Sequence, residues 1–165
     1  MIQRHLRPLV LEALDDTRVV VVLGARQVGK STLVEQIAAT DRQATTLTLD
    51  DQATRDSAID DPTGFVAGLT PPVVIDEIQR APDLLLAIKV RVDRDQTPGQ
   101  FLLTGSADLV TARVVADALP GRVEYVNLWP LAQAEVAVRL ASVVDGLLAG
   151  VPPQVVGAPK GRAHD

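Results

Sequence analysis

Two glycines, a lysine and a hydroxyl residue occur at a defined spacing between positions 24 and 31. The run Gly24-Ala-Arg-Gln-Val-Gly-Lys-Ser31 fits the pattern G-x-x-x-x-G-K-[S/T] at every position. Glycines allow such a loop to turn so that its backbone N–H groups point inward at phosphate oxygens. Lys30 would then reach the β- and γ-phosphates of a nucleotide, and the Ser31 hydroxyl would ligate Mg²⁺. The alternative is a glycine turn before a helix that happens to carry Lys-Ser.

The expected nucleotide-binding residues are this loop and the start of the helix that follows it. They are Gly24, Ala25, Arg26, Gln27, Val28, Gly29, Lys30, Ser31 and Thr32. Arg26 can point outward as easily as toward phosphate.

Two adjacent carboxylates follow a short apolar run in Val73-Val-Ile-Asp76-Glu77. Ligands bind at the carboxyl ends of strands in open α/β sheets, and this pair would lie there. We expect Asp76 to hold Mg²⁺ through its water shell, and Glu77 to orient or deprotonate an attacking water. The alternative is that the pair caps a helix.

A third apolar run, Phe101-Leu-Leu-Thr104-Gly-Ser106, also ends in hydroxyl residues. Thr104 or Ser106 would sense a γ-phosphate or position water. An equally weighted alternative is that one of them starts the next helix. Together with Lys30 and Glu77, these residues complete the expected catalytic set.

The elements around these motifs alternate between strand and helix patterns. Apolar and β-branched runs predict strands at 18–23, 45–49, 73–75, 100–103 and 123–128. Helical spacing predicts helices at 2–14, from about residue 30, at 50–58, at 82–92 and at 133–148, and Pro62 breaks the pattern. The alternation predicts an α/β fold in which a parallel five-stranded sheet is sandwiched by helices.

Composition narrows the function classes. The 165 residues suit one domain, with a net charge of −5, two Phe, one Tyr, one Trp and no cysteine. The negative charge and the few aromatic residues argue against nucleic-acid binding, and the absence of cysteine excludes disulfides and thiolate metal sites. No apolar run approaches a membrane span, and a cytoplasmic protein is the default expectation.

The chain resembles a bacterial and archaeal family of AAA-type ATP-binding proteins. The resemblance covers roughly residues 4 to 135. It is carried by LGARQVGKSTLVEQI, LDD at 49–51, VVIDEIQRAPDLLLAIKVRVD, FLLTGSADL and GRVEYVNLWPLAQAE, in that order. It implies a P-loop NTPase of the additional-strand catalytic Glu type, in which the strand with Thr104 lies between the P-loop strand and the Asp76 strand. The expectation of ATP rather than GTP rests on this resemblance, helped by the absence of an N-K-x-D motif.

Similar family members usually carry a second, C-terminal domain. We expect residues 1–150 to form the ATPase domain and residues 151–165 to be a flexible tail or truncated linker. The predicted helix at 133–148 has an apolar stripe that could bind a protein partner or a second copy of the chain: Val136, Leu140, Val143, Val144 and Leu147.

Three groups of residues have weaker predictions. Asp50 and Asp51 are expected to cap the next helix rather than approach Mg²⁺. Arg113 and Arg122 are candidate arginine fingers, although a solvated surface position is favoured for each. Trp129-Pro130 is expected to be a packing and turn element rather than an adenine platform.

The motifs leave three functions open. The first is ATP hydrolysis with Mg²⁺, coupled to a conformational change in a partner or missing domain. The second is a nucleotide-dependent switch with negligible turnover. The third is a small-molecule kinase, which usually needs an arginine-rich lid that this sequence lacks.

Overall fold

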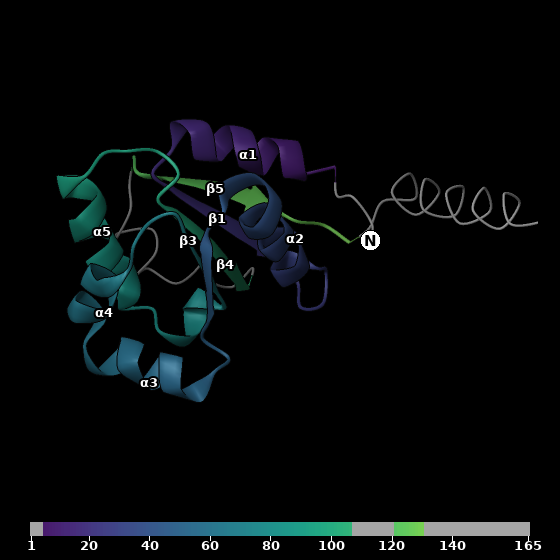
Figure 1. Cartoon of the computed structure of the whole chain (residues 1–165). Coiled ribbons are helices and arrows are strands. Elements are labelled where there is room, and N and C mark those ends of the chain that lie inside the picture. Colours follow the sequence, from purple (N-terminus) through teal and green to yellow (C-terminus); the bar gives the residue numbers. More distant parts are fainter. Residues whose placement is uncertain (1–4, 107–120, 131–165) are drawn as a thin grey trace, which may run out of the picture. The chain divides into compact units, whose positions relative to one another are not determined.

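The computed structural model describes residues 5–106 and 121–130, and all of these belong to one compact unit. The predicted helix at 133–148 and the predicted tail at 151–165 lie outside the described residues. The elements, in chain order, are α1 (Arg7–Asp16), β1 (Val19–Gly24), α2 (Lys30–Ile37), a π-helical turn (Ala38–Arg42), β2 (Thr45–Thr48), α3 (Gln52–Asp60), α4 (Pro62–Gly68), β3 (Val73–Asp76), a 3₁₀ turn (Ile78–Arg80), α5 (Leu84–Arg94), β4 (Phe101–Ser106) and β5 (Val123–Asn127) (Figure 1).

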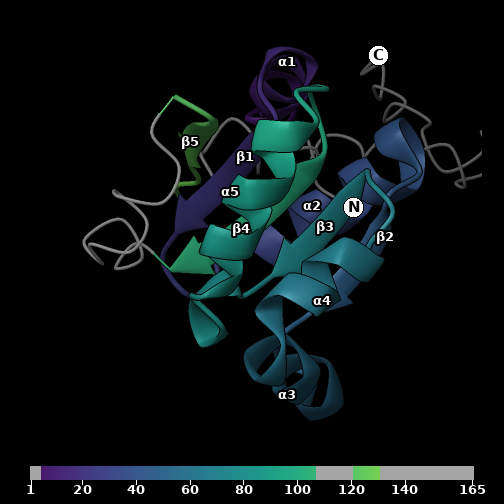
Figure 2. The same ribbon diagram turned by 90° about the vertical axis from the view of Figure 1, so that its left-hand side faces the viewer.

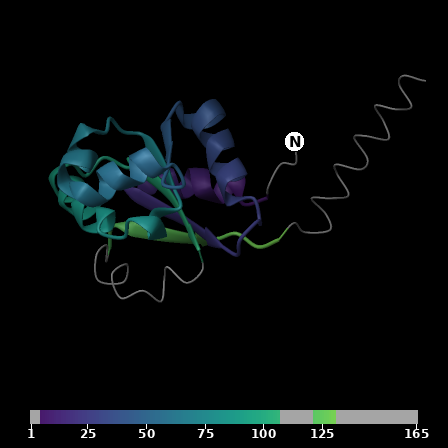
Figure 3. The ribbon, with the colours of Figure 1, turned by 90° about the horizontal axis from the view of Figure 1, so that it is seen from below.

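The five strands form one sheet in the order β2-β3-β4-β1-β5, and every neighbouring pair is parallel. Strand β4 therefore lies between β1 and β3, which confirms the order implied by the resemblance. Thr104 pairs with Val22 of β1, and Gly24 pairs with Ser106. Figure 3 shows β5, in green, beside β1, in purple. The carboxyl ends of the strands meet at one edge, as parallel pairing requires.

Strand β1 is buried along its whole length because helices cover both faces of the sheet. Its side chains alternate between the faces, so Val21 packs with Ile75 and residues of α3, α4 and α5, whereas Val20 packs with residues of α1 and α2. Figure 2 shows α4 and α5 in front of the sheet and α2 behind it. The continuous valine run predicted this double burial.

One helix was not predicted. Pro62 was expected to interrupt the helical pattern, but it begins α4 and occupies the first turn of that helix. Proline is tolerated there because its missing N–H has no partner in the helix. Asp61 caps the helix by accepting a hydrogen bond of 2.8 Å from the N–H of Gly64.

Of the helices that the structure describes, none is long and apolar enough to cross a membrane.

Candidate functional site

The glycine-rich loop connects β1 to α2, as predicted. Gly24 is the last residue of β1, and α2 begins at Lys30. The loop turns through two left-handed residues, Gln27 with φ 66° and Gly29 with φ 91°. Space is restricted at Gly24, because a Cβ there would lie 2.4 Å from the carbonyl oxygen of Leu128. The chain leaving β5 thus packs directly against the first residue of the loop.

The loop residues differ in exposure. Ala25, Arg26 and Gln27 are exposed, Val28 and Gly29 are half-buried, and Thr32 is exposed on the first turn of α2. The side chain of Lys30 is buried, and its Nζ lies 3.2 Å from the carbonyl oxygen of Gly24 and 3.0 Å from that of Ala25. The ammonium group is therefore held inside the loop, beside the positive end of the α2 dipole.

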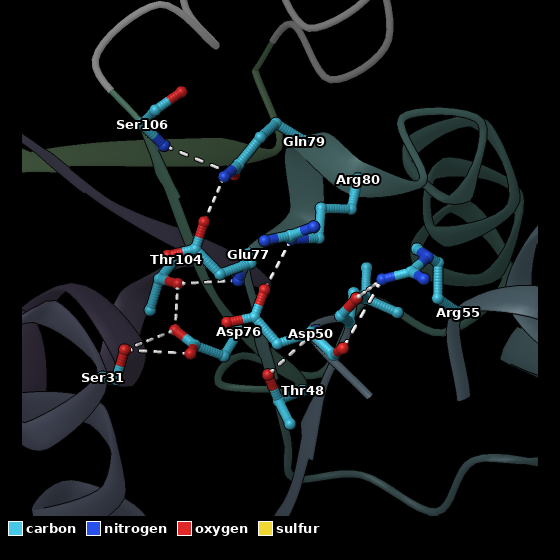
Figure 4. Close-up of polar contacts among 11 residues, drawn as sticks. Ser31, Thr48, Asp50, Arg55, Asp76, Glu77, Gln79, Arg80, Thr104 and Ser106 are labelled. Carbon is cyan, nitrogen blue, oxygen red and sulfur yellow. Dashed lines mark hydrogen bonds and ion pairs between the residues drawn. The ribbon is translucent and has the colours of Figure 1, made fainter. Parts of the chain in front are cut away.

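Ser31 and Asp76 are brought together from α2 and β3. The Ser31 hydroxyl lies 2.9 and 3.1 Å from the two carboxylate oxygens of Asp76 (Figure 4). Asp76 is buried at the end of β3, and its backbone carbonyl accepts a hydrogen bond from the N–H of Leu49 after β2. This pair supplies hydroxyl and carboxylate oxygens, the ligand types that Mg²⁺ prefers.

Thr104 connects both carboxylate residues to β4. Its hydroxyl donates to Asp76 Oδ1 and accepts a hydrogen bond of 3.0 Å from the N–H of Glu77. The side chain is completely buried, and its hydroxyl forms hydrogen bonds with Asp76 and Glu77. The alternative that Thr104 starts a helix is wrong, since Thr104 lies inside β4. For Ser106, the last residue of β4, that alternative stays a prediction, because residues 107–120 lie outside the described part of the chain.

Glu77 has an unusual backbone conformation. Its φ of 61° lies in the left-handed region, which non-glycine residues seldom adopt. It precedes the 3₁₀ turn without a side-chain capping bond, and Asp76 lies inside β3, so the helix-capping alternative for the pair is wrong. The Glu77 carboxylate accepts a hydrogen bond from Gln79 Nε2.

Gln79 is a site residue that sequence reasoning missed. Its Oε1 accepts a hydrogen bond of 3.3 Å from the N–H of Ser106, so its amide lies between Glu77 and the end of β4. The available signal was its position two residues after Glu77, but a glutamine there carries no chemistry that would single it out.

Asp50 and Asp51 have separate roles. Asp51 caps α3, as expected, by accepting a hydrogen bond of 2.8 Å from the N–H of Thr54, and this bond lowers the pKa of Asp51. Asp50 does not cap the helix but forms an ion pair of 2.5 Å with Arg80 Nε (Figure 4).

Arg122 lies at the opposite edge of the sheet. It precedes Val123, which pairs with Val19 at the start of β1, about 17 Å from the Gly24 end of that strand. Its guanidinium forms an ion pair with Asp93, and this hydrogen bond lowers the pKa of Asp93. Arg122 therefore cannot reach the loop of its own chain. The other candidate finger, Arg113, lies outside the described residues.

Trp129-Pro130 was expected to be a packing and turn element, and the packing part of that prediction is wrong for Trp129. It follows buried Leu128 at the end of β5, and 72% of its surface is exposed. Nothing in the sequence around Trp129 indicated that this side chain would be exposed.

The described residues contain no group of three or more His, Cys, Asp or Glu side chains that could hold a metal ion alone. Such a site would differ from the usual magnesium site beside a nucleotide, where one or two protein ligands join phosphate oxygens and water. Ser31 and Asp76 fit that smaller donor set.

Comparison with known proteins shows the family. A family model described as an AAA domain matches residues 16–137. Two curated relatives, named only as uncharacterized proteins of Mycobacterium bovis and Mycobacterium tuberculosis, are each 36% identical over 142 residues. These residues are 86% of this chain and 31% of each relative, so the chain spans about a third of the curated relatives it matches.

Two solved structures are similar at low identity. An unliganded sugar kinase from Janibacter sp. HTCC2649 matches 87% of this chain and 81% of its own, at 19% identity and a TM-score of 0.39. A Signal Transduction ATPase with Numerous Domains (STAND) protein with a tetratricopeptide repeat sensor, from Pyrococcus horikoshii, matches 93% of this chain and 26% of its own, at 15% identity and a TM-score of 0.47.

The parallel sheet, the glycine-rich loop between β1 and α2, and the acidic pair at the end of β3 make up the P-loop NTPase fold. The family match extends over most of the chain. The protein therefore belongs to the AAA domain family and has that family's nucleotide-binding fold.

Proposed function

We propose that this chain binds ATP with Mg²⁺ and hydrolyses the ATP. The observation that carries the proposal is the meeting of Ser31 with Asp76 at 2.9 and 3.1 Å, with Glu77 directly after Asp76. Ser31 from α2, Asp76 from the end of β3 and Glu77 just after it thus bring a hydroxyl and two carboxylates to the edge where the glycine-rich loop lies. AAA domain membership supports nucleotide binding independently of this geometry.

The loop and α2 hold the phosphates in this proposal. Backbone N–H groups of residues 24–29 and the N-terminus of α2 donate to phosphate oxygens. Lys30 exchanges its bonds to the Gly24 and Ala25 carbonyls for the β- and γ-phosphates. The buried position of Lys30 keeps its charge poorly hydrated, which strengthens its attraction for phosphate.

Ser31 and Asp76 are the residues that would hold Mg²⁺, Ser31 directly and Asp76 through water. When bound, Mg²⁺ neutralises charge on the phosphate oxygens. Thr104 keeps the Asp76 carboxylate turned toward Ser31, because its hydroxyl donates to Asp76 Oδ1 from the buried side. The two ligands are thereby oriented before any nucleotide arrives.

Glu77 is the proposed general base. Its carboxylate accepts a proton from the water that attacks the γ-phosphate, a role that requires hydrogen-bond reach and a fixed direction. The bond from the Glu77 N–H to Thr104 fixes the backbone from which that side chain extends.

Phosphate release and thermal stability test the proposal together. Wild-type chain with ATP and Mg²⁺ should release phosphate, and Glu77→Gln should lower the rate of release about 10²- to 10⁴-fold while keeping nucleotide affinity. ATP at about a hundred times its dissociation constant should stabilise the fold by roughly 2.7 kcal/mol. Lys30→Ala should remove that stabilisation. ATP at millimolar concentration that gives no thermal shift, or equal release by Glu77→Gln, would refute the binding or the hydrolysis respectively.

The alternative is a nucleotide-dependent switch with negligible turnover. The position of Arg122, at the far edge of the sheet and paired with Asp93, favours it, because phosphoryl transfer gains about 10³ to 10⁵ in rate from a correctly placed arginine. Tight ATP binding without phosphate release would support this alternative. In either case we propose that nucleotide state is coupled to a conformational change in a partner or in a further part of a longer protein.

A further inference from the structure

The candidate site contains a glutamine for which the proposed function has no role so far. Gln79 is half-buried in the 3₁₀ turn after β3. Both ends of its amide are bonded: Nε2 donates to Glu77 Oε2, and Oε1 accepts from the Ser106 N–H at 3.3 Å (Figure 4). One side chain thus joins the proposed base to the last residue of β4.

The chemistry of its neighbours fixes which way this amide points. A backbone N–H only donates, so the amide oxygen must face Ser106, and an ionised carboxylate only accepts, so the NH₂ group must face Glu77. Position 79 therefore requires a side chain that carries a hydrogen-bond acceptor and a hydrogen-bond donor at the same distance from the backbone. Among the amino acids, glutamine meets this need, whereas glutamate keeps the acceptor and loses the donor.

The two parts of Glu77 are anchored to the same strand by different residues. The Thr104 hydroxyl accepts a hydrogen bond from the Glu77 N–H and so anchors the Glu77 backbone. The Gln79 amide connects the Glu77 carboxylate to the N–H of Ser106, which lies two residues farther along β4. A glutamate side chain has several rotatable bonds, and fixing its backbone alone leaves the carboxylate free to sample many rotamers. The second anchor removes that freedom.

We propose that Gln79 is a positioning residue that holds the Glu77 carboxylate in the orientation needed for hydrolysis. The proposal rests on the proposed function, since it assigns Glu77 the role of base. Gln79 occupies Oε2, and Oε1 is the oxygen that takes the proton from water. A misplacement of about 1 Å can lower a rate by about 100-fold, so a residue that acts only through Glu77 can have a large effect.

A double-mutant cycle tests the proposal. Wild type, Gln79→Met, Glu77→Gln and the double variant are compared for kcat and for ATP affinity. Gln79→Met removes both hydrogen bonds of the side-chain amide while nearly keeping the shape of the side chain. It should lower kcat about 10- to 100-fold, with ATP affinity changed less than about twofold. In the Glu77→Gln background the same substitution should cause no further loss, because a residue that acts through Glu77 has nothing left to position. An equal loss in both backgrounds, or a loss of affinity that matches the loss of kcat, would overturn the proposal.

Two further variants separate positioning from folding. Gln79→Glu keeps the acceptor for Ser106 and replaces the donor by a carboxylate oxygen, so it should lower kcat as much as Gln79→Met; wild-type activity in this variant would overturn the proposal. Gln96→Met is the matched control, because Gln96 is exposed in the connection between α5 and β4, at the opposite edge of the sheet. It should leave kcat unchanged.

The amide signal of Gln79 provides a readout that does not depend on turnover. In ¹⁵N-labelled protein, the side-chain NH₂ pair that disappears in Gln79→Met identifies this residue. The pair should shift in Glu77→Ala and stay unmoved in the control Glu124→Ala, whose exposed side chain lies on β5. A pair that ignores Glu77→Ala would overturn the positioning role. Absence of ATP turnover in wild type, with a normal response of the amide pair, would refute the hydrolysis alone.

Discussion

At the scale of single residues, Glu77 combines its proposed chemistry with a backbone that its side chain disfavours. In the left-handed region the Cβ atom crowds the following carbonyl oxygen, at a cost of roughly 1–2 kcal/mol for a non-glycine residue. The φ of 61° places Glu77 in that region. Its bonds to Thr104 and Gln79 hold it there. Strain of this kind persists where surrounding contacts over-determine a conformation.

This strain leads to a prediction that separates stability from activity. Glu77→Gly should be more stable than Glu77→Ala by about 1 kcal/mol, because glycine adopts the left-handed conformation without the Cβ penalty. Neither variant should hydrolyse ATP. Urea unfolding monitored by circular dichroism measures the difference. Equal stability of the two variants would show that the backbone at position 77 carries no strain.

At the scale of elements, the strands were predicted well because a strand that is buried on both faces of the sheet has a continuous run of apolar residues. The valines of β1 and the apolar residues of β3 are continuous, and both strands lie inside the sheet. Edge strand β2 is mostly exposed, yet its alternation of Thr and Leu was sufficient to identify it. Helix α4 was missed because Pro62 was interpreted as the end of a helical pattern. Proline is equally typical of the first turn of a helix, and Pro62 begins α4.

The site could be predicted as far as its motifs extend. Spacing within one segment placed Gly24, Lys30 and Ser31 on a strand–loop–helix unit, and it placed Asp76 at a strand end. The contacts between segments could not be predicted, because they depend on the register of β3 and β4. That register brings Thr104 level with Asp76, and it places Ser106 where Gln79 can reach it.

The start of α4 gives a prediction at this scale. Asp61→Ala should destabilise the fold by about 0.5–2 kcal/mol, because the N–H of Gly64 would lose its capping acceptor. Asp60→Ala is the matched control, since Asp60 is the exposed neighbour at the end of α3. Thermal unfolding of both variants measures the effect. A loss of equal size in the control would indicate that general charge, and not the cap, is responsible.

At the scale of the whole molecule, several carboxylates have pKa values below their ordinary value of 3.8. A hydrogen bond from Arg7 is the largest cause for Asp41, and bonds from Thr54, Arg122 and Thr97 act on three others. A group whose pKa is lower in the folded state binds protons more readily when the chain is unfolded. The stability that such groups contribute is therefore fully present above pH 4–5, on the order of one unit above their ordinary value, and is lost as the pH falls through their lowered values.

The corresponding prediction is a decline of the melting temperature on acidification below about pH 4. Asp41→Asn should be less stable than wild type at pH 7 and should show a flatter decline, because one of the titrating groups has been removed. Melting curves between pH 7 and pH 2.5 measure both. A parallel decline in the two proteins would show that the Arg7–Asp41 pair does not contribute to the acid response.

A second prediction at this scale concerns association. The apolar stripe predicted at 133–148 lies outside the described residues. That a partner or a second copy of the chain covers this stripe stays a prediction from the sequence. We expect this 165-residue chain to self-associate through this segment and to turn ATP over slowly. Light scattering and turnover are to be measured on wild type and on a Leu140→Glu, Val144→Glu variant, which should be monomeric. A monomeric wild type with brisk hydrolysis would contradict both expectations.

The close approach of Leu128 to Gly24 has a consequence for how mutational scans of this loop should be interpreted. Because a Cβ at position 24 would lie 2.4 Å from the Leu128 carbonyl oxygen, any side chain there requires the backbone at Leu128 or at the start of the loop to shift before a ligand is involved. The effect of substituting the first motif glycine is therefore ambiguous, since a shift of the backbone at this contact and a loss of phosphate binding would both lower activity. A scan would score Gly24 among the least tolerant positions even in a selection for folding alone. Lys30→Ala in the presence and absence of nucleotide is the cleaner genetic probe, because the loop backbone that it leaves behind has no such clash.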